Sequence, residues 1–207
     1  MEDFSFRHRL MLRLLELFPQ ILLVALCNSR AMGEADANSD IDLFIIAKKG
    51  NLWTVRFIVT ALTSMLGVRR RNTHGLQKWT PEYIKRTKDR FCLSFFITEE
   101  AMNFENIRLQ PHDPYLDKWI ATLIPLVNKR DTFERFIETN ESRVQKTEDK
   151  GQKRGFSLFE RLIKKLWLPR TLQTYERLGK PWGVIISDTM LKFHNQDVRR
   201  EYADTQL

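Results

Sequence analysis

Two carboxylates stand two residues apart where an apolar run begins. Asp40 and Asp42 lead into Leu43–Ile46, a run typical of a β-strand. Successive strand side chains point to opposite faces, so the two acids share one face. Neighbouring carboxylates repel each other and are costly to desolvate unless a cation lies between them. Carboxylates suit Mg²⁺, which also binds substrate phosphates. The pair is compatible with a metal–nucleotide site. Such triplets are common, however, and taken alone this one favours a turn at Ser39–Asp40 followed by a solvated strand end at Asp42.

A turn of small residues precedes these acids. The apolar run Ile21–Cys27, expected to be a buried strand, leads directly into Asn28 and Ser29. Ten residues then separate Ser29 from Asp40. Residues 30–36 are expected to form a short helix whose N-terminus points at the turn. Helix N-termini attract phosphate through their free N–H groups and their dipole. The turn is therefore a candidate phosphate site beside the acids.

This combination resembles the polymerase-β-type nucleotidyltransferase superfamily. Small members of that superfamily carry Gly-Ser, a spacer of about ten residues, and then Asp-x-Asp at the head of a strand. The resemblance covers residues 21–46 well and residues 51–98 only as a pattern of elements. Gly33 and the run Ser39–Leu43 also match the usual form of the motif.

The turn departs from the family pattern at two positions. Asn28 stands where the family usually has Gly, and Met32 where many members have Arg. Asn tolerates a left-handed backbone better than other non-glycine residues, so we expect the turn to be kept. The change at Met32 removes one potential phosphate contact.

A third departure concerns the third carboxylate of the family, which lies in the middle of the third sheet strand. The corresponding run here is Arg90–Thr98, which contains no acid, and Ser94 takes the expected place. The candidates for a substitute are Asp89 before this run and Glu99 or Glu100 after it.

The resemblance implies a nucleotidyltransferase that moves a nucleoside monophosphate from a nucleoside triphosphate such as ATP to RNA, a protein or a small molecule. It implies that Asp40 and Asp42 are the catalytic residues and bind Mg²⁺. The nucleotide-binding residues that it implies are Asn28, Ser29, Arg30, Gly33 and Ser39. Basic side chains that could assist are Arg30, Lys48 and the run 69–71. The alternative is a catalytically weakened nucleotide- or RNA-binding module on the same fold, because the third carboxylate is not evident.

The rest of the chain predicts an α+β fold, a small mixed sheet with flanking helices and a helical C-terminal extension. We expect a nucleotidyltransferase-like domain over residues 1–110 and a mostly helical region over 111–207, with a charged linker near 141–155. The expected helices are 4–18, 52–66, 114–127, 132–140 and 156–168, and the expected strands are 21–27, 40–47, 90–98 and 182–187.

Composition limits the class of protein. The 207 residues are 43% hydrophobic and carry a net charge of +8, which favours polyanionic partners such as nucleotides or nucleic acid. Cys27 and Cys92 lie within predicted strands, so buried thiols in a reducing cytoplasm are expected. No apolar run approaches the ~20 residues that a spanning helix requires, so we predict a cytoplasmic protein without stable membrane insertion.

Overall fold

A six-stranded mixed sheet lies at the centre of the computed structural model, which describes residues 4–71, 73, 75–109, 112–141, 157–193 and 199. The strand order is β4-β1-β2-β3-β6-β5, with β2 and β3 parallel and every other neighbouring pair antiparallel. The predicted mixed sheet is confirmed. The strands are β1 Ile21–Cys27, β2 Ile41–Ala47, β3 Phe91–Thr98, β4 Ile124–Asn128, β5 Val184–Ile186 and β6 Met190–Phe193.

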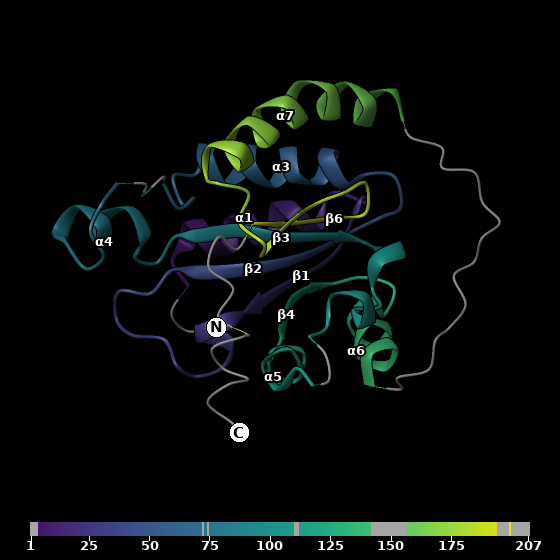
Figure 1. Cartoon of the computed structure of the whole chain (residues 1–207), viewed down its shortest axis with the longest axis horizontal. Helices are drawn as coiled ribbons and strands as arrows, with labels where there is room; N and C mark the ends of the chain where they lie inside the picture. The colour runs from purple at the N-terminus through teal and green to yellow at the C-terminus, as the bar shows by residue number, and fades with distance from the viewer. Residues whose placement is uncertain are drawn as a thin grey trace.

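Helices cover both faces of this sheet (Figure 1). One face carries α1 and α3, with α7 packed on α3, and the other carries α5 and α6. The flanking helices and the helical C-terminal part are therefore as predicted. The helices are α1 Phe6–Glu16, α2 Asn28–Ala31, α3 Leu52–Met65, α4 Pro81–Thr87, α5 Pro114–Ala121, α6 Thr132–Glu141 and α7 Leu158–Arg177, with 3₁₀ turns at Glu99–Ala101 and Glu105–Ile107.

The side chains of β2 alternate between two hydrophobic cores. Leu43 and Ile45 pack in the core under α1, α3 and α7, whereas Phe44 and Ile46 pack in the core with α5 and α6. Both faces of the strand are covered, so its sequence is a continuous apolar run. Asp42 shares the parity of Phe44, so its side chain lies on the face of α5 and α6.

The predicted helix 114–127 is wrong in its second half. The helix α5 ends at Ala121, and Ile124–Asn128 is strand β4, which pairs with β1 at the edge of the sheet. Pro125 explains the change, because proline breaks a helix interior but is tolerated in an edge strand. The apolar spacing of this segment fits either element, and pairing with β1 selects the strand.

Other boundaries also differ from the predictions. Helix α2 begins at Asn28 and ends at Ala31, where the sequence predicted residues 30–36. Helix α7 continues past Pro169 to Arg177, and α4 and β6 were not predicted. The predicted linker near 141–155 lies outside the described residues except for Glu141, the last residue of α6.

The region after residue 110 contributes strands as well as helices. Strands β4, β5 and β6 all belong to the same sheet as β1, β2 and β3. The domain division at residue 110 stays a prediction. In the described part of the chain, no helix combines the length and the apolar character that crossing a bilayer requires.

A buried carboxylate joins α7 to α3. Glu160 is 1% exposed, and its two oxygens accept hydrogen bonds from the backbone N–H groups of Trp53 at 2.8 Å and Thr54 at 2.7 Å. These N–H groups belong to the first turn of α3, where no intrahelical acceptor exists. Asn51, the N-cap residue of α3, makes no side-chain capping bond. Glu160 therefore caps α3 from another helix, and its charge is favoured there by the helix dipole.

Glu160→Ala is expected to lower the free energy of unfolding by about 2–3 kcal/mol, because two buried amide donors lose their acceptor. Glu160→Gln should cost less, since its carbonyl oxygen still accepts one bond. Urea denaturation followed by circular dichroism measures both changes. The control is Glu176→Ala on the exposed side of α7, expected to stay within about 0.5 kcal/mol of the parent chain. Equal effects at Glu160 and Glu176 would contradict the capping role.

Candidate functional site

Three strand ends bring the candidate ligands together. Asp42, the second residue of β2, is in register with Cys27 at the end of β1 and with Cys92 near the start of β3. Side chains of directly opposed residues point to the same face of a sheet. Ligand atoms of Asp40, Asp42 and Cys92 all lie within 4.8 Å of one another. The two acids predicted to share a face are therefore adjacent, and a thiol is beside them.

The third position of the site is a cysteine, whereas the sequence suggested Ser94. Asp42 pairs with Cys92, but the next matched pair is Phe44 with Phe95, so β3 holds one extra residue at this point. This bulge breaks the simple alternation along β3 that the sequence interpretation assumed. Ser94 is buried after the bulge, and Cys92 is the β3 residue opposite the acids.

None of the proposed substitute acids joins the pair among the described residues. Asp89 forms an ion pair with Arg30 at 2.5 Å. Glu99 and Glu100 follow the far end of β3; Glu99 is seven positions from Cys92, on the order of 23 Å along an extended strand. A third carboxylate is therefore not found in the part of the chain that the structure describes.

Arg70 supplies the cation that the acid pair requires. Its Nη1 donates a hydrogen bond to Asp40 Oδ2 at 2.6 Å and lies 3.6 Å from Cys92 Sγ. The backbone N–H of Arg70 donates to the carbonyl of Phe91 at 2.9 Å, which fixes this loop beside the start of β3. The sequence showed only a basic run at 69–71. Pairing of the loop with β3 is what selects Arg70 for contact with the acids.

The charges of the site are unbalanced near neutral pH. Burial, together with the charge of Asp40, raises the pKa of Asp42 to about 6, against opposing hydrogen bonds from Cys92 and Asn28. Burial raises the pKa of the Cys92 thiol well above its usual value, so this thiol is neutral at pH 7. Two carboxylates then face one guanidinium, and the excess negative charge favours a bound cation.

The turn before the acids keeps the backbone that the sequence predicted. Asn28 has φ of +57°, in the left-handed region that asparagine tolerates, and its Oδ1 accepts a hydrogen bond from Trp119 Nε1 of α5 at 2.8 Å. Gly33, with φ of +73°, ends the turn. Cys27, the N-cap residue of α2, makes no side-chain capping bond. The first N–H groups of α2, at Asn28 and Ser29, therefore have no side-chain cap in the described part of the chain.

Two of the predicted nucleotide-binding residues hold the loop that carries Asp40. The guanidinium of Arg30 donates to the backbone oxygens of Ser39 at 2.9 Å and Asp40 at 3.0 Å. The hydroxyl of Ser39 accepts from the N–H of Asp36 at 3.0 Å. Lys48 follows the far end of β2, six positions from Asp42 or roughly 20 Å along the strand, so it cannot assist at the acids.

The donor set fits a magnesium ion through its two carboxylates. Mg²⁺ takes hard oxygen ligands and commonly uses one or two carboxylates together with phosphates and water. Asp40 and Asp42 meet this requirement, whereas the neutral thiol of Cys92 is a poor ligand for a hard cation. Arg70 holds one oxygen of Asp40, so a bound ion competes with this ion pair.

Comparisons with known proteins do not identify a family for this chain. No protein-family model matches the sequence, and no curated protein matches it. A crystal structure of a toxin–antitoxin with AMP-PNP is similar over 81% of this chain and 99% of that chain, at 12% identity and a TM-score of 0.37. A likeness this weak carries no weight for either the fold or the function.

The raised pKa of Asp42 predicts that stability falls as pH rises from about 4 to about 6. The folded protein holds this proton up to about pH 6, whereas the unfolded chain releases it near 3.8. Above pH 6 the group therefore opposes folding, and below pH 4 it does not. Asp42→Asn should raise Tm at pH 7.5 and leave it unchanged at pH 4, measured by calorimetry with EDTA present. Asp131→Asn, at an exposed turn, is the control; equal shifts at both pH values for Asp42→Asn would refute the assignment.

The Arg70–Asp40 ion pair predicts that removing the guanidinium strengthens cation binding. Arg70→Gln frees Asp40 Oδ2 and removes a positive charge, so the affinity for Mn²⁺ is expected to rise several-fold or more. Arg71→Gln is the matched control, since this exposed neighbour has the same charge and, in the described part of the chain, forms no ion pair with either acid. Electron paramagnetic resonance of free Mn²⁺ measures both affinities. Weaker binding to Arg70→Gln than to Arg71→Gln would contradict the competition.

Proposed function

We propose that this protein binds a nucleoside triphosphate through Mg²⁺ held by Asp40 and Asp42 and transfers the nucleotidyl group to an acceptor. The observation that carries the proposal is the pair of carboxylates at the start of β2, within 4.8 Å of each other and of Cys92, beside the turn that opens α2. The sequence motif that spans this turn and these acids supports the same function.

Each residue of the site has a definite part in the proposed reaction. Asp40 and Asp42 hold the ion, which when bound offsets negative charge on the phosphate oxygens. The uncapped N–H groups at Asn28 and Ser29 orient the phosphates. Arg70, beside Asp40, offers a second positive charge to an incoming phosphate, because its planar guanidinium binds oxyanions well.

Cys92 makes the proposed chemistry slow. A group that activates an acceptor hydroxyl must accept its proton, and such general bases typically contribute about 10²–10⁴-fold to a rate. The Cys92 thiol is already protonated at neutral pH because burial raises its pKa. The acceptor hydroxyl therefore loses its proton to water or to a group that the acceptor itself brings.

A second candidate is a module that binds nucleotide without transferring it. The neutral thiol in place of a third acid and the guanidinium already bound to Asp40 favour this alternative. Both candidates share the same ion and the same acids. The net charge of +8 supports RNA as the acceptor in the first case or as the bound polyanion in the second.

The two candidates differ in whether label from a triphosphate becomes covalently attached. We expect the full chain, incubated with Mg²⁺, α-³²P-labelled ATP, GTP, CTP or UTP and total RNA or cell lysate, to label an acceptor slowly. The same nucleotides labelled at the γ-phosphate should give no label. Cys92→Asp, which places an acid opposite Asp42, is expected to raise the rate about tenfold or more.

Matched variants make the outcome specific. Asp42→Asn should abolish labelling, Cys92→Ser should not raise it, and Asp131→Asn at an exposed turn should leave it unchanged. Binding of a non-hydrolysable ATP analogue, measured by calorimetry with and without Mg²⁺, tests the second candidate. Mg²⁺-dependent binding without labelling, even in Cys92→Asp, selects the binding module. If the protein neither binds the ATP analogue nor labels an acceptor, both candidate functions are overturned.

A further inference from the structure

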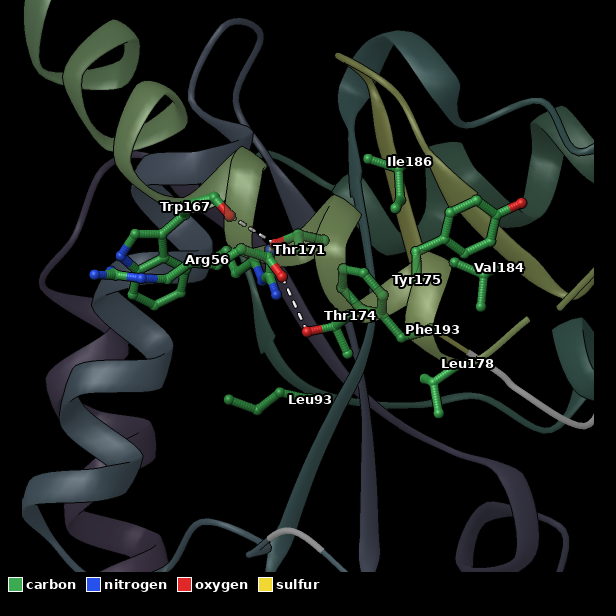
Figure 2. A pocket seen from close by; sticks show the side chains of 11 residues that line it. Arg56, Leu93, Trp167, Thr171, Thr174, Tyr175, Leu178, Val184, Ile186 and Phe193 are labelled. Atoms are coloured by element: carbon green, nitrogen blue, oxygen red, sulfur yellow. Dashed lines mark hydrogen bonds between the residues drawn. The ribbon is translucent and has the colours of Figure 1, made fainter. Parts of the chain in front are cut away.

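A cavity of about 560 Å³ lies between α7 and the β5–β6 hairpin (Figure 2). Its volume falls within the range of roughly 300–1,000 Å³ that is typical of small-molecule sites. Most of its lining is apolar. The apolar side chains on its walls are Leu93, Trp167, Leu178, Val184, Ile186 and Phe193.

Arg56 brings a guanidinium to this apolar wall. Its carbon Cζ lies 5.4 Å from the ring centroid of Trp167 and 4.6 Å from that of Phe193, and Nη1 donates a hydrogen bond to Thr171 Oγ1 at 3.1 Å. A guanidinium has five N–H donors. The aromatic faces offset part of the desolvation of the cation but accept no conventional hydrogen bonds from it.

The charge of Arg56 has no acidic partner among the described residues. Burial, together with the nearby cation Arg69, lowers the pKa of Arg56 to about 10, so the group stays charged at pH 7 in a partly desolvated place. A second basic residue, Arg170, also lines the cavity. Cations that are removed from water are normally paired with an anion. An apolar cavity that gathers positive groups is therefore complementary to a ligand with a negative end.

We propose that this cavity binds a small monoanionic carboxylate with an apolar body. The carboxylate pairs with the guanidinium of Arg56, whose planar N–H groups match two carboxylate oxygens. The apolar body lies against Leu93, Val184 and Ile186. Of the two lining arginines, Arg170 is exposed to water and Arg56 is the desolvated one. One desolvated guanidinium matches one negative charge, which favours a carboxylate over a phosphate dianion.

This cavity is separate from the acid site. Leu93 lies in the core under α1, α3 and α7, whereas its neighbour Cys92 faces Asp40 and Asp42 on the other side of the sheet. The two sites therefore lie back to back across β3, and the carboxylate proposal does not depend on the nucleotide proposal.

Calorimetry with the full chain tests the assignment through a matched pair of probes. We expect 4-phenylbutyrate to bind at one site per chain and 4-phenylbutanol, its neutral counterpart, to bind about tenfold more weakly or worse. Arg56→Met should lower the affinity for 4-phenylbutyrate by about tenfold or more and leave the affinity for 4-phenylbutanol unchanged. Val184→Trp, which fills the cavity and keeps Arg56, should abolish binding of both probes. Arg135→Met, an exposed arginine on α6, should bind like the parent chain.

Several outcomes would overturn the proposal. Absence of saturable 4-phenylbutyrate binding is one, and equal affinities of the acid and the alcohol for the parent chain is another. Tighter binding of phenyl phosphate than of 4-phenylbutyrate would overturn the carboxylate assignment. If circular dichroism shows that Arg56→Met does not fold, the comparison of probes in the parent chain and in Val184→Trp decides the question.

Discussion

The repulsion between the carboxylates of Asp40 and Asp42 is the constraint on which the site depends. The start of β2 brings ligand atoms of both acids within 4.8 Å of each other, and burial together with the charge of Asp40 raises the pKa of Asp42 to about 6. Arg70 offsets the charge of Asp40 through an ion pair of 2.6 Å between Nη1 and Oδ2. Asp42 has no such ion pair among the described residues. The ion pair offsets one of the two negative charges, and the other charge favours a bound cation.

The framework around the acids is built from contacts between distant segments. Asp42 is held between β1 and β3 by strand register, and Trp119 of α5 fixes Asn28 at the turn through a hydrogen bond of 2.8 Å. On the other face, Glu160 caps α3 and keeps α7 over the sheet. The acid site and the cavity beside Arg56 thus occupy opposite faces, and both lie next to the start of β3.

Local patterns predicted the parts of the fold whose signals are local. The apolar runs of β1, β2 and β3 and the shared face of the two acids follow from residue type and spacing. The left-handed turn at Asn28 follows from the family resemblance, together with the tolerance of asparagine for this backbone. Long-range pairing decided the rest. The bulge that sets Cys92 opposite Asp42 depends on strand register, and Pro125 lies in a strand only because β1 offers an edge. The sequence does not distinguish Arg70 from Arg69 and Arg71, because its contact with the acids depends on the pairing of its loop with β3.

The most direct test of the metal site is a crystal of the full chain grown with Mn²⁺ and a non-hydrolysable nucleoside triphosphate analogue. Anomalous scattering locates the ion independently of the phasing model. We expect a peak within coordination distance of Asp40 and Asp42, shared with phosphate oxygens, and Arg70 displaced from Asp40 Oδ2. A peak elsewhere, or a triphosphate bound away from both acids with the Arg70–Asp40 pair intact, would contradict the account.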